Sequence, residues 1–144
     1  MTTPVSLPAG TLLALARRGL VEAMSTDRPG ERYAIAHLAA LRAAAAVLAC
    51  RARPAGGSSG VRRSRPTSAW VLLANVAPEL SEWAGFFAAG ARKRAAAEAG
   101  LPSAVTSREA DDLVRDAETF LSVVETTLGF DGHQLLLAGR RVAG

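Results

Sequence analysis

The residues best suited to acid–base chemistry are an arginine and a histidine five positions apart, Arg32 and His37. A histidine can donate or accept a proton during cleavage of an RNA phosphodiester, and an arginine can stabilise the charge that develops on the phosphate. On a straight helix, five residues turn two side chains roughly 140° apart. The pair would therefore meet only if the helix began after Arg32, or between the two chains of a dimer. The alternative is a partly buried His37 beside Tyr33 and a solvated Arg32.

A second chemical feature is a cluster of arginines with no acidic residue among them. Lys93 is the only lysine among 17 basic residues. Guanidinium groups attract phosphate, and a Gly/Ser-rich chain lets them adapt to RNA or DNA. The segment lacks aromatic residues that would stack on bases, so a solubilising linker is the alternative. The candidate nucleic-acid-binding residues are Arg51, Arg53, Arg62, Arg63 and Arg65.

The acidic residues do not predict a metal centre. Asp112 and Asp116 are spaced to share one helix face, as are Glu79 and Glu82, but no histidine or further carboxylate nearby completes a set of ligands. We interpret them as solvated helix faces and predict no metal ion. No phosphate-binding or dinucleotide motif is present, so no cofactor is predicted. The single cysteine, Cys50, excludes an internal disulfide.

Length and composition indicate one helical domain. The chain has 144 residues, of which 49% are apolar and 5% aromatic, so it is long enough for one core and too short for two. Alanine is abundant while β-branched residues are sparse, which favours an all-α fold. The first residues lack the basic and apolar regions of a signal peptide, and the most apolar stretch, Ala34 to Cys50, is shorter than a bilayer span. We therefore expect a soluble cytoplasmic protein.

Proline, glycine and capping residues divide the chain into helices. A first helix is predicted from about residue 8 to 24, and a second from about 29 to 53, each with apolar residues at helical spacing. A flexible loop rich in Gly, Ser and Arg follows at 54–66.

The third helix is predicted to begin after Thr67 or Ser68 and to stop near Gly100. Its apolar seam continues past Pro78, which indicates either one helix kinked there or two helices stacked end to end. The fourth helix begins with a capping box, Thr106 to Glu109, and runs to Leu128. Its acidic residues are expected to face mostly toward solvent: Asp111, Asp112, Asp116, Glu118 and Glu125.

These elements predict an antiparallel up-and-down four-helix bundle, formed by a single domain over residues 1–144 with a C-terminal tail at 129–144. Both tryptophans, with Phe86 and Phe87, lie in the third segment and are expected to anchor the core. The tail contains a short Gln-Leu-Leu-Leu stretch, which either packs on the bundle or docks on another protein.

The layout resembles the HEPN domains, in particular small actinobacterial HEPN-like proteins. The resemblance is carried by Glu31–Ala49, Ser68–Leu73 and Ala77–Gly100, together with the final amphipathic helix. It implies an antiparallel helical bundle and one of several functions: RNA cleavage, non-catalytic binding of RNA or nucleotides, or pairing with nucleotidyltransferases. Catalytic members carry an arginine and histidine motif with a polar residue after the arginine, usually near the C-terminus. Here the matching spacing lies early in the chain and Tyr33 follows the arginine.

We therefore predict a non-enzymatic protein that acts by binding RNA or DNA through the arginine-rich loop, or by binding a protein partner. A homodimer is one arrangement that fits this prediction. The alternative is a dimeric, metal-independent ribonuclease that uses Arg32 and His37.

Overall fold

The computed structural model describes residues 7–51, 68–101 and 104–130, and these ranges contain helices but no strand. The all-α prediction is confirmed. The predicted loop 54–66 and nearly all of the tail lie outside the described residues. The elements are α1 (Ala9–Met24), α2 (Pro29–Arg51), α3 (Ala69–Val76), a 3-10 turn (Pro78–Leu80), α4 (Ser81–Glu98) and α5 (Ser107–Leu128).

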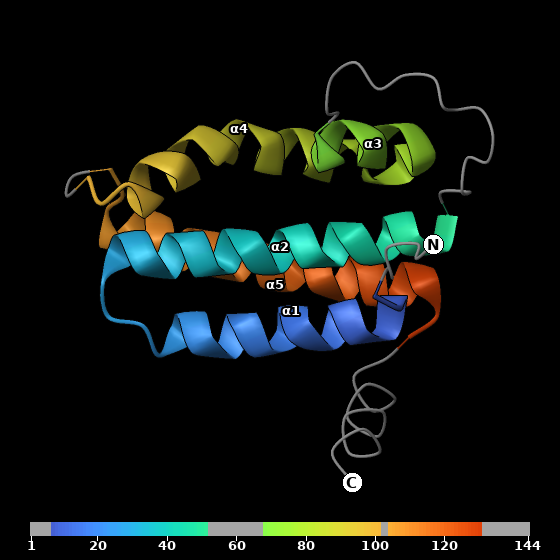
Figure 1. Ribbon diagram of the computed structural model, residues 1–144, viewed down its shortest axis with the longest axis horizontal. Helices are drawn as coiled ribbons and strands as arrows, with labels where there is room; N and C mark the ends of the chain where they lie inside the picture. The colour runs from blue at the N-terminus through green and yellow to red at the C-terminus, as the bar shows by residue number, and fades with distance from the viewer. Residues whose placement is uncertain (1–6, 52–67, 102–103, 131–144) are drawn as a thin grey trace, which may run out of the picture.

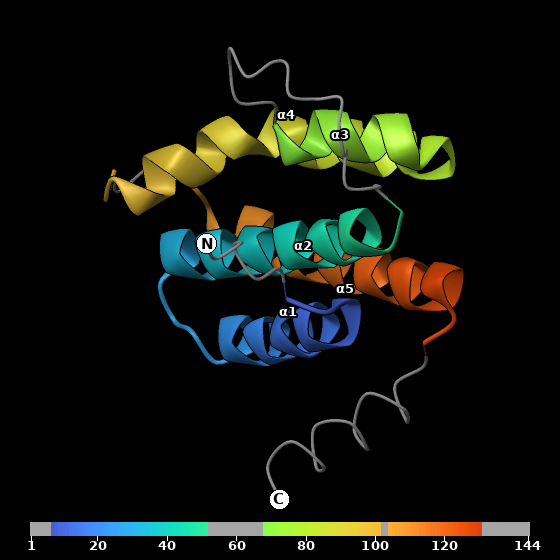
Figure 2. The same ribbon diagram turned by 45° about the vertical axis from the view of Figure 1, so that its right-hand side comes forward.

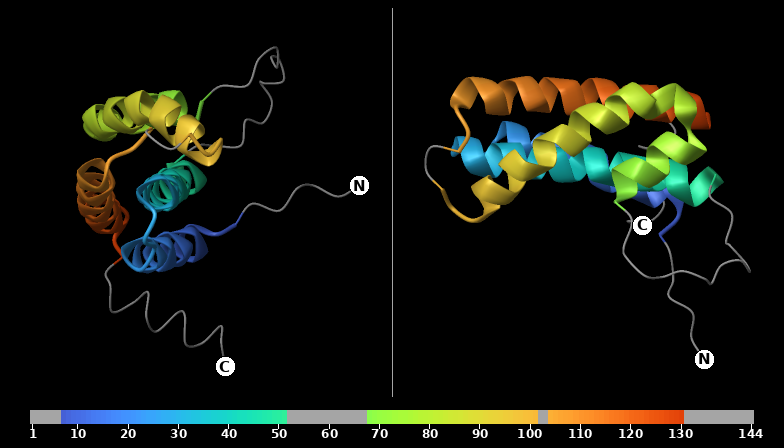
Figure 3. Two further views of the ribbon diagram at one scale, coloured as in Figure 1. Left: turned by 90° about the vertical axis from the view of Figure 1, so that its left-hand side faces the viewer. Right: turned by 90° about the horizontal axis from the view of Figure 1, so that it is seen from above.

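Helices α2 and α5 run side by side in the same direction through the middle of the molecule (Figure 1). Helix α1 lies on one side of this pair and runs antiparallel to both. The α3–α4 layer covers the other side, as the end-on view shows (Figure 3). The rotated view in Figure 2 shows the same order of layers. Helix α2 thus contacts every other helix, and its side chains decide how closely the layers approach.

The third predicted helix is two helices, and they do not stack end to end. Pro78 has no N–H to donate and restricts the backbone before it. Helix α3 ends at Val76, and the next residue, Ala77, has φ −136° and ψ 73°. Trp70 and Phe87 would lie about 25 Å apart along one continuous helix, yet their ring centroids are 5.2 Å apart. The chain therefore turns back at Pro78, so the prediction of a split is confirmed and the end-to-end arrangement is wrong.

The capping residues define the helix ends as predicted. The Thr106 hydroxyl accepts a bond from the Glu109 N–H (3.0 Å), and the Glu109 carboxylate accepts one from the Thr106 N–H (2.9 Å). The Ser68 hydroxyl accepts from the Trp70 N–H at the start of α3. Gly129 follows α5 with a φ of 82°, a conformation that favours glycine over residues with a side chain.

Small residues on α2 and α4 allow the layers to pack closely. Ala43, Ala44 and Ala46 of α2 are completely buried, so only methyl groups separate this part of α2 from its neighbours. On α4, a methyl group at Gly90 would lie only 2.8 Å from the Tyr33 hydroxyl of α2. The absence of a side chain at this position lets α4 lie directly against α2.

One acidic residue of α5 faces the interior. Glu125 is 4% exposed, and its two carboxylate oxygens accept bonds from Nε and a terminal nitrogen of Arg17 on α1. The expectation that Glu125 faces solvent is therefore wrong. A buried carboxylate is tolerated here because a bidentate guanidinium compensates its charge.

Among the described helices, α2 alone has the length and apolar composition that a membrane span needs. The expectation that the apolar stretch is too short to span a bilayer is therefore wrong, because α2 extends over 23 residues. Half of its most apolar window is buried against the rest of the protein.

Candidate functional site

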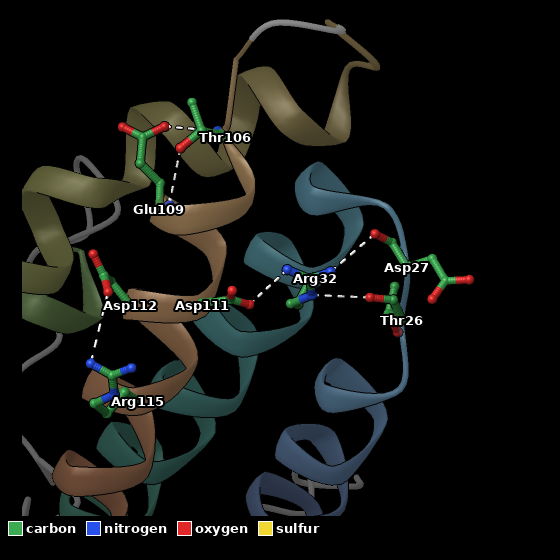
Figure 4. A network of polar contacts seen from close by, with 8 residues as sticks. All are labelled: Thr26, Asp27, Arg32, Thr106, Glu109, Asp111, Asp112 and Arg115. Atoms are coloured by element: carbon green, nitrogen blue, oxygen red, sulfur yellow. Dashed lines mark hydrogen bonds and ion pairs between the residues drawn. The ribbon is translucent and has the colours of Figure 1, made fainter.

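The side chain of Arg32, in α2, forms hydrogen bonds to the α1–α2 connection and to α5 (Figure 4). It lies in the first turns of α2, and its Nε and one terminal nitrogen donate to the backbone carbonyls of Thr26 (3.0 Å) and Asp27 (3.0 Å). Its other terminal nitrogen donates to Asp111 of α5 at 2.8 Å. The side chain is 16% exposed. The guanidinium therefore joins the α1–α2 connection to α5.

His37 lies on the opposite side of α2, beneath the α3–α4 layer. It is completely buried, and its Nε2 lies 2.9 Å from the Phe87 carbonyl oxygen. Because a carbonyl can only accept, Nε2 carries the proton and Nδ1 is left without a partner among the described residues. The rings of Tyr33, Trp70 and Phe87 surround the imidazole.

The structure does not bring Arg32 and His37 together within the chain. Arg32 is bonded to the α1–α2 connection and α5, whereas His37 faces α3 and α4. A second chain could not complete the pair without opening the α3–α4 layer, because no surface of His37 is exposed. This arrangement suits a structural histidine and gives no access for a phosphodiester.

The surroundings of His37 are expected to make the stability of the protein depend on pH. Burial lowers the pKa of the imidazole; the bond to the Phe87 carbonyl opposes this, the charge of Arg94 adds to it, and Glu98 opposes it. Below pH about 6.5 and above the folded-state pKa, the unfolded chain binds more protons than the folded chain. The free energy of unfolding is therefore expected to fall as pH falls through this window, by at most about 1.4 kcal/mol per pH unit.

Urea denaturation between pH 7.5 and 5 measures this effect, with His37→Gln as the matched variant. Glutamine can also donate to the Phe87 carbonyl but does not titrate, so its loss of stability over this range is expected to be smaller than that of the wild type. Equal losses in the two proteins would show that His37 does not sense pH.

Of the five arginines predicted to bind nucleic acid, the structure describes only Arg51. Its guanidinium lies 2.7 Å from a carboxylate oxygen of Glu79 and its side chain is 32% exposed. The Glu79 pKa is lowered by a bond from its own backbone N–H and by Arg51. The other four lie outside the described residues: Arg53, Arg62, Arg63 and Arg65.

The charges of the chain are segregated. We call residues 7–51, 68–101 and 104–130 the helical body. It holds 11 of the 17 basic and 12 of the 13 acidic residues, a formal charge of −1, so the remaining segments carry +5. Seven of the 11 basic residues form ion pairs within the helical body. The excess positive charge therefore resides in residues 52–67 and 131–144.

Within the helical body, no three His, Cys, Asp or Glu side chains gather as a metal ion would require. Asp112 lies 3.9 Å from Arg115 on the same helix. Cys50 is exposed near the end of α2.

One surface feature was not predicted from the sequence. An open groove of about 310 Å³ lies between α4 and α5, lined by Glu82, Trp83, Phe86 and Asp116. The sequence suggested two solvated acids and two core aromatics, but Phe86 is 46% exposed. The sequence could have indicated an exposed aromatic residue here, because the neighbouring residues Phe86 and Phe87 on a helix cannot both face the core in the same way.

Comparison with known proteins identifies the family but no individual relative. A search of curated proteins and a search of solved structures each found no match for this chain. The family model described as SAV_6107-like HEPN matches residues 23–125, well over half of the chain. The match covers most of α2 to α5 and the arginine-rich segment. The chain therefore belongs to the SAV_6107-like HEPN family.

Proposed function

We propose that this HEPN-family protein acts by binding and not by catalysis, and that its ligand is RNA or DNA. The observation that carries the proposal is the segregation of charge, with −1 on the helical body and +5 on the remaining segments. Phosphate contacts made by arginines supply most of the affinity in sequence-independent binding. The proposal places the protein in the cytoplasm, where such a ligand is available.

The arginines at 62, 63 and 65 are expected to contribute most. They are close together and no acidic residue lies between 52 and 67. Arg51 is expected to contribute less, since binding a phosphate would compete with its ion pair to Glu79. RNA cleavage is not part of the proposal, because His37 is buried and Arg32 is bonded within the helical body.

A salt titration tests the proposal. Binding of a fluorescent single-stranded RNA is measured from 25 to 200 mM salt for the wild type and for the triple variant Arg62→Gln, Arg63→Gln, Arg65→Gln. Each phosphate contact contributes about −0.7 to the slope of log K against log salt. The slope of the triple variant is therefore expected to be less negative than that of the wild type by about two.

The matched control replaces three arginines of the helical body that form ion pairs: Arg28→Gln, Arg94→Gln and Arg115→Gln. It has the same net charge as the triple variant but is expected to keep the wild-type slope. No measurable binding at low salt, or equal slopes for the two triple variants, would contradict the proposal.

A second candidate is a protein partner, specifically a second copy of this chain. It is favoured by Val71 and Leu72 of α3, which are 52% and 40% exposed on the outer layer. Sedimentation of the wild type is expected to give a dimer that Val71→Glu dissociates. A monomer at all concentrations would exclude this candidate without affecting the first.

A further inference from the structure

The groove between α4 and α5 combines two aromatic walls with two carboxylates. Trp83 and Phe86 of α4 have ring centroids 6.4 Å apart and planes at 87°, so they present two perpendicular surfaces. Glu82 of α4 and Asp116 of α5 complete the lining. The groove is open to solvent on one side, where Phe86 is 46% exposed.

The aromatic walls are held in place by the core. Trp83 is stacked on Phe87 (6.0 Å, 17°) and packs against Phe120 at 5.5 Å. Phe86 and Phe87 form a T-shaped pair, with ring centroids 4.9 Å apart and planes at 76°. Because Phe87 and Phe120 are completely buried, the two walls are fixed before any ligand arrives, which reduces the entropy lost on binding.

The two carboxylates carry negative charge at the edge of the groove. Within the described residues, neither Glu82 nor Asp116 takes part in an ion pair. Burial and the nearby charge of Asp112 raise the pKa of Asp116, and Arg115 only partly offsets them. A positively charged ligand would offset the repulsion between the carboxylates of Asp112 and Asp116, whereas a phosphate would itself be repelled by both.

The chemistry of the lining selects one kind of cation. An aromatic face attracts any cation within about 6 Å of the ring. The two carboxylates additionally favour a cation with hydrogen-bond donors, which a quaternary ammonium lacks. The ammonium of lysine has donors but is compact and strongly hydrated, and it cannot stack flat on a ring. A guanidinium can stack flat on a ring while donating through several N–H groups to carboxylates.

We propose that the groove formed by Glu82, Trp83, Phe86 and Asp116 binds an arginine side chain presented by a peptide segment of a protein partner. The guanidinium stacks against the aromatic walls and donates to the two carboxylates, while the peptide backbone remains on the open side. None of these four residues belongs to the basic segments proposed to hold nucleic acid, and the groove has the opposite charge preference.

Fluorescence polarisation with a labelled glycine-rich peptide tests the proposal. One peptide carries a single arginine, and its partner carries citrulline, which has nearly the same shape but no charge. The full-length wild type is expected to bind the arginine peptide at least about tenfold more tightly than the citrulline peptide. Equal binding of the two peptides, or no binding at millimolar protein, would overturn the proposal.

Substitutions of the lining residues test whether the arginine peptide binds in the groove. The double variant E82Q/D116N is expected to weaken arginine-peptide binding at least about tenfold, and F86A about threefold to tenfold. The control E22Q/E118Q removes the same charge from exposed sites elsewhere and is expected to bind as the wild type does. Circular dichroism checks that each variant is folded, and F86A, at an exposed position, provides a test should the double variant unfold.

Two results would exclude an external partner at this site. The first is wild-type affinity in both E82Q/D116N and F86A. The second is binding that appears only after Arg62, Arg63 and Arg65 have been replaced by glutamine, which would assign the groove to the arginines of the chain itself.

Discussion

Replacement of Phe87 by alanine is expected to lower the free energy of unfolding by about 3–5 kcal/mol. Phe87 is completely buried, and a truncated side chain would leave a cavity where α3, α4 and α5 meet. Total stabilities of such domains are about 5–15 kcal/mol, so the loss is a large share of the whole. The ring of Phe87 contacts those of His37, Trp70, Trp83, Phe86 and Phe120.

The adjacent residue provides the control for this effect. Phe86→Ala removes the same atoms from a side chain that is 46% exposed, and it is expected to cost less than about 1.5 kcal/mol. Urea denaturation of both variants measures the difference. Similar losses in the two variants would mean that the α3–α4 layer does not pack as described.

Replacement of Arg17 by methionine is expected to be the second most destabilising change, at about 2–3 kcal/mol. The Glu125 side chain is 6% exposed and its carboxylate is bonded to the Arg17 guanidinium. Without that partner the carboxylate is left buried and uncompensated. The estimate lies below that for a fully buried pair because the Arg17 side chain is 36% exposed.

The double variant R17M/E125L separates loss of a partner from loss of packing. Apolar residues of similar size can replace a buried ion pair at little cost, so the double variant is expected to be within about 1 kcal/mol of the wild type. Chemical denaturation of the wild type, R17M and the double variant provides the comparison. A double variant less stable than R17M would show that the carboxylate is not the source of the effect.

The sequence predicted those features that depend on neighbouring residues. Thr106 and Glu109 satisfy each other's N–H groups across one turn, so the start of α5 is encoded locally. The break at Pro78 is likewise set by the ring of one residue. The direction of the chain after the break was not predictable, because it depends on Trp70 packing against Phe87.

The roles of charged residues depended on partners far away in the sequence. Arg32 bonds to Asp111, 79 residues away, and Arg17 bonds to Glu125, 108 residues away. Helical spacing alone placed Arg32 and Glu125 in solvent, since it shows which residues share a face but not what covers that face. The groove at Trp83 was missed for the same reason, because α5 contributes Asp116 to its lining.

We propose that the basic segments bind nucleic acid and that the helical body, with its formal charge of −1, does not contact it. Amide chemical shifts of the full-length protein, recorded with and without a single-stranded RNA, test this most directly. The largest changes are expected within residues 52–67 and 131–144, with small changes around Arg32 and His37. Large changes centred on Arg32 and His37, with none in the basic segments, would contradict it.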